Sequence, residues 1–185
     1  MIEPQAPLMP TPAETARFWE LLEAVWELQG PEANQARRTL AHREPTAEPF
    51  DTPDEVWALL EVVNEALDAV VSNLQEHAEV LGAEDLTTFD RVVERLLYNV
   101  DRADIHSFTD GSDDGFLYAR GFILVMGKEF YEAVDAEPGK AIDDAECGEI
   151  CYLFAHAHNR RFGDFPDTGS GITRETTGNQ AEWPD

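Results

Sequence analysis

The chain has 185 residues, of which 43% are hydrophobic, so it is long enough and apolar enough to bury the core of one domain. It carries 13 Lys and Arg against 38 Asp and Glu, which gives a formal net charge of −25. Such an excess of acid repels phosphate backbones and anionic lipids, so we expect no nucleic acid and no membrane as partners, and we favour a basic protein or peptide.

The cytoplasm is the expected compartment. Two cysteines do not make a disulfide framework. The first residues, MIEPQAPLMPTPAE, lack the basic and apolar regions of a signal peptide. The longest uninterrupted apolar run, Phe122 to Met126, is much shorter than a membrane span.

The first predicted helix begins near Thr11. Thr11 precedes Pro12 and lies three residues before Glu14, the spacing of a capping box with proline at the first helical position. Apolar residues then recur at helical spacing until Gly30 and Pro31, which end the segment.

A similar start occurs at Thr52. Thr52, Pro53 and Glu55 have the spacing of a second capping box, and residues 52–63 echo residues 11–25. The echo covers about a dozen residues and no complete structural unit, which favours two ordinary helix starts over an internal duplication.

The remaining pattern is also helical. Apolar residues at helical spacing predict further helices at about 53–81, 84–102, 112–134 and 143–162, and no segment has the alternation of a strand. We therefore predict an all-α fold, a single-domain helical bundle with an irregular C-terminal tail. Its expected divisions are an N-terminal helical segment with a linker at 1–51, a helical bundle domain at 52–163 and the tail at 164–185.

One stretch resembles a known family. The segment SDDGFLYARGFILVMGKEFYEAV resembles the bacterial domain of unknown function 4240 family, whose pattern is matched at Ser112, Asp113, Asp114, Phe116, Tyr118, Arg120, Gly121 and Gly127. The resemblance extends over about 53–163 and implies no activity or cofactor. This chain departs from the pattern at Phe122, where the family has tryptophan, and at Ala119, where it has another aromatic residue.

The Ser-Asp-Asp stretch has two interpretations. In the structural one, Asp113 and Asp114 begin a helix at the end where its dipole favours negative charge, and Arg120 forms a buried ion pair. In the functional one, an aspartate is an acid or base and Arg120 anchors an anion. Arg120 lies within the most apolar helix, where a charge needs a partner or water. A pocket built on these residues would draw on Tyr118, His106 and Trp57.

A metal site is not predicted. Cys147, Cys151 and His158 share one face of the expected last helix, but they spread over roughly 16 Å, which is too far for one ion. Core packing is the favoured role of Cys151 and His158. No histidine follows a glutamate at the spacing of di-iron bundle proteins, and we expect no cofactor.

The helix expected from residue 53 to residue 81 carries an acidic stripe. Its simplest interpretation is a solvated face, and the functional alternative is a docking face for a basic protein or peptide. The residues of this candidate docking face are Glu61, Glu65, Asp68, Glu76 and Glu79.

Two classes of function follow. The first is a non-catalytic cytoplasmic interaction or regulatory module, and the second is a small enzyme or ligand-binding protein centred on Asp113, Asp114 and Arg120. We favour the first, because the sequence holds no complete set of nucleophile, base and charge stabiliser.

Overall fold

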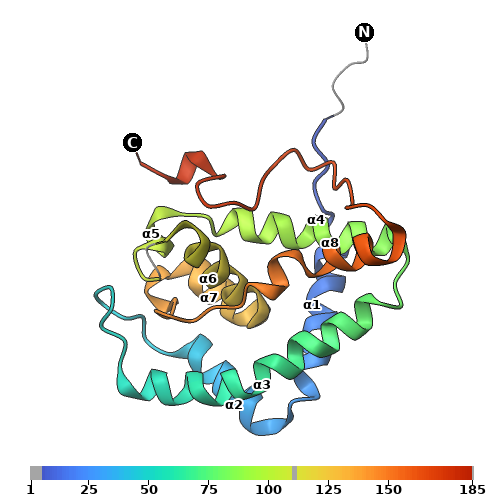
Figure 1. The fold of residues 1–185 in the computed structure, drawn as a ribbon. Coiled ribbons are helices and arrows are strands. Elements are labelled where there is room, and N and C mark those ends of the chain that lie inside the picture. The colour runs from blue at the N-terminus through green and yellow to red at the C-terminus, as the bar shows by residue number, and fades with distance from the viewer. Residues whose placement is uncertain (1–5, 110–111, 185) are drawn as a thin grey trace.

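The computed structural model describes residues 6–109 and 112–184 (Figure 1). These residues form helices and no strands, which confirms the all-α prediction. The α-helices are α1 (Pro12–Glu27), α2 (Gly30–His42), α3 (Asp54–Ala78), α4 (Ala83–Asn99), α5 (Ala103–His106), α6 (Asp113–Val125), α7 (Lys128–Ala136) and α8 (Glu149–Phe162), with short 3₁₀ helices at η1 (Pro138–Lys140) and η2 (Gln180–Glu182).

The two predicted helix starts differ. At α1 the capping box is confirmed, because Thr11 accepts from the backbone N–H of Glu14 and the Glu14 side chain accepts from the backbone N–H of Thr11. The capping box predicted at Thr52 is wrong. Pro53 occupies the N-cap position of α3 and no side chain caps this end, because the helix starts one residue too late for Thr52 to reach its free N–H groups.

The single helix predicted over residues 112–134 is also wrong, because it breaks between α6 and α7. Gly127 adopts φ +93°, and a Cβ there would lie 2.3 Å from Nη1 of Arg37 and 2.4 Å from Oε1 of Glu23. Arg37 is paired with Glu23 and donates to the carbonyl oxygen of Met126 at 2.9 Å. An ion pair between the buried Arg37 of α2 and the partly exposed Glu23 of α1 thus fills the space beside the break.

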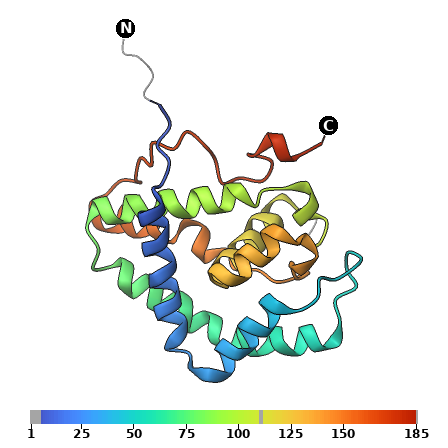
Figure 2. The same ribbon diagram turned by 180° about the vertical axis from the view of Figure 1, so that it is seen from behind.

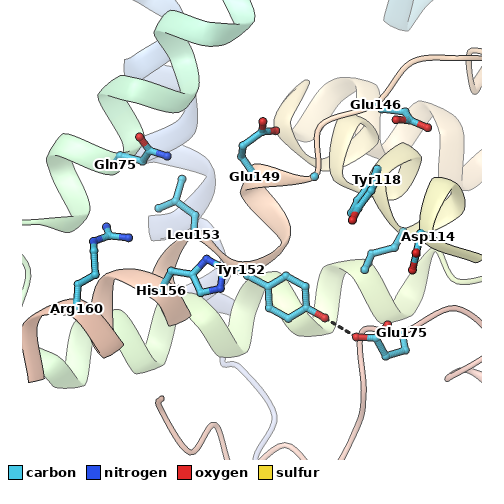
Figure 3. Close-up of a pocket in the computed structure, with 12 residues that line it drawn as sticks. Gln75, Asp114, Tyr118, Glu146, Glu149, Tyr152, Leu153, His156, Arg160 and Glu175 are labelled. Carbon is cyan, nitrogen blue, oxygen red and sulfur yellow. Dashed lines mark hydrogen bonds between the residues drawn. The ribbon is translucent and has the colours of Figure 1, made fainter. Parts of the chain in front are cut away.

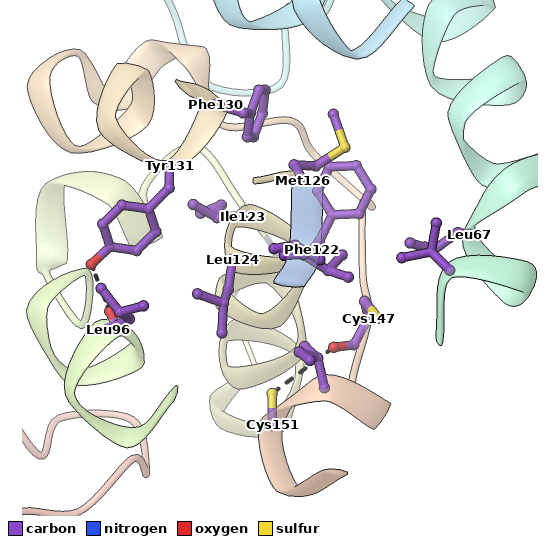
Figure 4. Packing of buried hydrophobic residues seen from close by; sticks show 14 of the residues in the cluster. Leu67, Leu96, Phe122, Ile123, Leu124, Met126, Phe130, Tyr131, Cys147 and Cys151 are labelled. Carbon is purple, nitrogen blue, oxygen red and sulfur yellow. Dashed lines mark hydrogen bonds between the residues drawn. The ribbon is translucent and has the colours of Figure 1, made fainter. Parts of the chain in front are cut away.

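The core lies around α6, whose central residues are buried on every side (Figure 4). Phe122, Ile123 and Leu124 are each at most 1% exposed. Helices α4 and α8 run side by side on one flank of α6, α3 and α2 close the lower end, and α1 crosses behind them (Figures 1 and 2). The apolar run Phe122–Met126 therefore lies in the core of the fold.

The described part of the N-terminal segment belongs to the same core. Phe18 is fully buried, and its ring packs against the rings of Phe89 and Phe154 at 6.3 Å between centroids. The Trp26 indole donates to the carbonyl oxygen of Val125 at 2.7 Å, which ties α1 to the end of α6. Burial of such large aromatic side chains is a major source of stability.

The chain after α8 is irregular, as predicted. Gly163 ends α8 in the left-handed conformation with φ +90°, the expected glycine cap. The following segment then runs back along α4 towards α5 (Figure 1). It is held at Arg174, which pairs with Asp90, and at Trp183, which packs on Phe116.

Candidate functional site: an acidic cleft between α3, α6 and α8

A cleft of about 710 Å³ opens between α3, α6, α8 and the C-terminal tail (Figure 3). Its lining combines carboxylates with two tyrosines and a histidine. The lining residues are Gln75, Asp114, Leu117, Tyr118, Glu146, Gly148, Glu149, Tyr152, Leu153, His156, Arg160 and Glu175.

One wall of the cleft is a face of α8. Glu149, Leu153, His156 and Arg160 follow one another at helical spacing, so their side chains point to the same side (Figure 3). The opposite wall is Tyr118 of α6.

The segment before α8 fixes the distance between these walls. The backbone N–H of Cys147 donates to the carbonyl oxygen of Tyr118 at 3.0 Å. Gly148 then packs flat against the Tyr118 ring, and a Cβ on this residue would lie only 2.8 Å from Cδ1 of the ring. A glycine at this position therefore allows α8 to begin in contact with α6.

The charge of the cleft is negative. Asp114, Glu146, Glu149 and Glu175 contribute carboxylates, and Arg160 is the one arginine or lysine among its lining residues. Both Nε and Nη2 of Arg160 donate to Oε1 of Glu79, so this cation is already paired. The acidic groups gather at the end of the cleft away from Arg160 (Figure 3).

Tyr152 lies at the floor of the cleft. Its hydroxyl donates to the carboxylate of Glu175, and the Arg174 guanidinium lies over its ring, 4.8 Å from the centroid. Burial and the Glu175 carboxylate raise the pKa of the Tyr152 hydroxyl above its ordinary value. Tyr152 therefore stays protonated at neutral pH and serves as a hydrogen-bond donor.

The structure separates the members of the Ser-Asp-Asp stretch. Ser112 caps α6 by accepting from the backbone N–H of Gly115 at 2.9 Å, so the stretch does begin a helix. Asp114 and Tyr118 line the cleft. Asp113 is exposed, and its carbonyl oxygen accepts a hydrogen bond from the Thr176 hydroxyl at 2.7 Å.

Arg120 points away from the cleft and into the core. It is fully buried, its Nη1 donates to the carbonyl oxygen of Leu97 at 3.0 Å, and its Nη2 donates to the Thr176 hydroxyl at 3.2 Å. The guanidinium lies 4.9 Å from the Phe116 ring centroid. Burial lowers the pKa of Arg120, and the nearby Asp101 carboxylate opposes this effect.

The partner of Arg120 is the end of a helix. Leu97 lies in the last turn of α4, where backbone carbonyls have no partner within the helix, and this turn contains no basic residue. Tyr131 donates to the neighbouring carbonyl of Leu96 at 2.8 Å, and Asn179 to that of Tyr98 at 3.2 Å. Arg120 thus supplies the positive charge that the C-terminus of a helix favours.

The other two pocket candidates lie elsewhere. His106 packs against Phe116 and Trp183, with ring centroids 4.8 and 5.2 Å away. Trp57 lies on α3 beside a separate shallow groove that includes Glu61 and Glu65. The structure therefore brings neither residue to the cleft.

The cysteines are core residues. Cys147 precedes α8 rather than lying on it, so it does not continue the helical face of Cys151. Both thiols are buried and free, and burial raises the pKa of each to about 12. His158 contacts the carbonyl oxygen of Asp164 through Nδ1 at 2.8 Å. Within residues 6–109 and 112–184, no three histidine, cysteine or acidic side chains converge to hold a metal ion.

The acidic stripe forms an exposed face on α3. Its members Glu61, Glu65, Asp68, Glu76 and Glu79 are all exposed. Of these, Glu79 pairs with Arg160 of α8, which joins the end of the stripe to the rim of the cleft.

Sequence reasoning missed most of the cleft. Of the lining residues only Asp114 and Tyr118 were candidates, and those it missed include Glu146, Glu149, Tyr152, His156 and Glu175. Those on α8 share a helical face, and that periodicity is visible in the sequence. Glu175 carried no signal, because an irregular segment has no periodicity from which to place it.

Comparison with known proteins adds one finding. A family model described as Protein of unknown function (DUF4240) matches residues 52–160, more than half of the chain. All cleft residues except Glu175 fall within that match. No curated protein and no solved structure shows a significant match. Across the described residues, none of the helices is both long and apolar enough to cross a membrane.

Proposed function

The chain belongs to the DUF4240 family, and we propose that it is a binding module whose acidic cleft takes a lysine- or arginine-bearing segment of a basic partner protein. The observation that carries this proposal is the composition of the cleft. It combines four carboxylates with an exposed tyrosine ring, and its one arginine is neutralised by Glu79.

A cationic side chain suits both the aromatic ring and the carboxylates of this lining. A lysine or arginine entering beside Tyr118 would meet the face of an aromatic ring, a contact worth about 0.5–1 kcal/mol at an exposed site. The same group would approach Asp114 and Glu149, which line the cleft from α6 and α8. Each exposed charge pair contributes about 0.2–1 kcal/mol, so binding rests on several such contacts and weakens with salt.

The exposed acids of α3 assist this function. Asp68 and Glu76 are exposed on the helix that also contributes Gln75 to the cleft. A negative electrostatic potential that extends beyond a binding site raises the association rate of a positively charged partner. We therefore assign recognition to the cleft and steering to the face on α3.

The cytoplasm is the proposed compartment. Cys147 and Cys151 are both free thiols and contribute to the core as small apolar groups. A reducing compartment keeps such thiols in this state.

The experiment measures binding of a fluorescein-labelled lysine–serine repeat peptide by fluorescence anisotropy. We expect affinity to fall steeply as salt is raised. Glu146→Gln with Glu149→Gln should weaken binding about tenfold, because both changes remove charge from the cleft while keeping the shape of two exposed side chains.

The matched control is Glu61→Gln with Glu65→Gln, which removes the same charge from α3 outside the cleft. We expect this pair to change affinity by about twofold at most. Equal losses in the two double variants, or binding that is indifferent to salt, would contradict recognition by the cleft.

A further inference from the structure

The C-terminal tail covers an unusually polar part of the core. Most buried side chains are apolar, yet Asp90, Glu94 and Asp101 on or beside α4 are buried carboxylates. All three carboxylates accept hydrogen bonds from the segment 168–183. The surface beneath the tail is therefore a charged groove rather than a continuation of the apolar core.

The groove holds Arg174 from several directions. Nη1 and Nη2 of Arg174 donate to the two carboxylate oxygens of Asp90, each at 3.0 Å, and Nη2 lies 3.4 Å from Oε1 of Glu94. Nη1 also donates to the carbonyl oxygen of Cys151, and the guanidinium lies over the Tyr152 ring. This bidentate pairing combined with stacking is specific to arginine, because a lysine ammonium cannot reproduce the planar fork.

A second set of contacts recognises the backbone of the tail. Asp101 is fully buried, and its carboxylate accepts from the backbone N–H groups of Thr177 at 3.1 Å and Asn179 at 2.9 Å. Its Oδ1 also accepts from the indole of Trp183 at 3.2 Å. The backbone held in this way forms a turn, in which the N–H of Gly178 donates to the carbonyl oxygen of Glu175 at 3.0 Å and Thr177 adopts φ +66°.

An aromatic site completes the groove. The Trp183 ring packs against His106 and Phe116, with centroids 5.2 and 5.8 Å away. The tail thus binds as a peptide ligand does, through an arginine socket, a backbone clamp and an aromatic anchor, with no regular structure between residues 164 and 174.

The family match covers the residues of the groove and leaves out the tail. Asp90, Glu94, Asp101, Phe116 and Tyr152 all lie within the matched residues 52–160, whereas the tail lies outside them. The joining segment is accessible, since Phe165 is 61% exposed.

We propose that the groove along α4 and α8 is a peptide-recognition site that the tail occupies in cis. Its partner in trans is a segment of another protein that carries an arginine, a turn directly after it and, farther along, an aromatic residue. This inference does not rest on the acidic cleft.

The test uses the full chain and a fluorescein-labelled peptide with the sequence of residues 166–184. This probe contains Arg174 against Asp167, Glu175 and Glu182, so it carries net negative charge and is not attracted to the acidic cleft. Fluorescence anisotropy reports binding to the wild-type chain and to the variant Arg174→Ala. In this variant the tail no longer pairs with Asp90 and Glu94.

We expect the probe to bind Arg174→Ala about tenfold more tightly than wild type, because the native tail competes in the wild-type chain. A probe with alanine in place of Arg174 should bind the same variant about tenfold more weakly. Equal binding of the probe to both chains, or equal binding of the two probes, would overturn the proposal.

If circular dichroism shows that Arg174→Ala does not fold, a second experiment takes its place. A protease site is inserted after Phe165 in the wild-type chain and cut once the protein has folded. Exchange of the cut tail for the labelled probe supports the proposal, and failure to exchange overturns it. A chain that instead dimerises by placing its tail on a second copy would overturn the assignment to a separate partner.

Discussion

Replacing Arg120 tests whether this buried guanidinium is structural. Arg120 is fully buried, and it donates to the last turn of α4 through Leu97 and to the tail through Thr176. Its position in the core, outside the cleft lining, predicts that Arg120→Ala lowers stability and leaves peptide binding by the folded protein unchanged.

The expected loss of stability is the sum of two costs and one gain. Truncation to alanine leaves a cavity, which costs about 2–5 kcal/mol for long side chains. It also leaves the buried carbonyl of Leu97 without its donor, at about 1–3 kcal/mol. Removal of a buried charge recovers several kcal/mol of lost hydration. We expect Arg120→Ala to lower the free energy of unfolding by about 2–4 kcal/mol.

Arg120→Met distinguishes the effect of losing the charge from the effect of losing side-chain volume. Methionine fills most of the space and removes the desolvated charge, so its cost should be below about 2 kcal/mol and smaller than that of alanine. The Asp101 carboxylate keeps its donors from Thr177, Asn179 and Trp183 in both variants, because none of these comes from Arg120. Urea unfolding measured by circular dichroism gives both values. A loss below about 1 kcal/mol in Arg120→Ala, together with lost peptide binding, would refute the structural role.

Two further predictions concern the contact between α6 and α8. Gly121→Ala should destabilise by about 1–3 kcal/mol in urea unfolding, because the new Cβ would lie 2.1 Å from the carbonyl oxygen of Cys147. Helix propensity alone would make it about 1 kcal/mol more stable, so a gain would contradict the close packing. Burial raises the pKa of Cys147 and Cys151 from 9.0 to about 12, so above pH 9 the unfolded chain loses thiol protons that the folded chain keeps. Stability should therefore fall as the pH rises from about 9 towards 12, and a Cys151→Ala variant should show a shallower fall.

The helical class followed from the sequence because periodicity records which face of each segment is buried. The all-α class is confirmed, and so is the resemblance of the chain to the family. The break at Gly127 was missed because the side chains packed against it, Arg37 and Glu23, are far away in sequence. A glycine alone does not reveal which distant ion pair will lie beside it.

The site was partly visible for the same reason. Asp114 and Tyr118 were among the candidates because they stand in a distinctive local motif. The role of Arg120 depends on the end of α4, and Glu175 reaches the cleft from an irregular tail. Contacts of this kind are set by tertiary packing, so local patterns did not predict them.

The central claim is that the acidic cleft recognises a cationic segment, and an NMR titration tests it most directly. The lysine–serine repeat peptide is added to ¹⁵N-labelled protein while the backbone amide shifts are followed. We predict that the shifted amides cluster at Asp114, Tyr118 and the Glu149–His156 face of α8. Shifts concentrated at Glu61 and Glu65, or spread evenly over the acidic surface, would contradict recognition by the cleft.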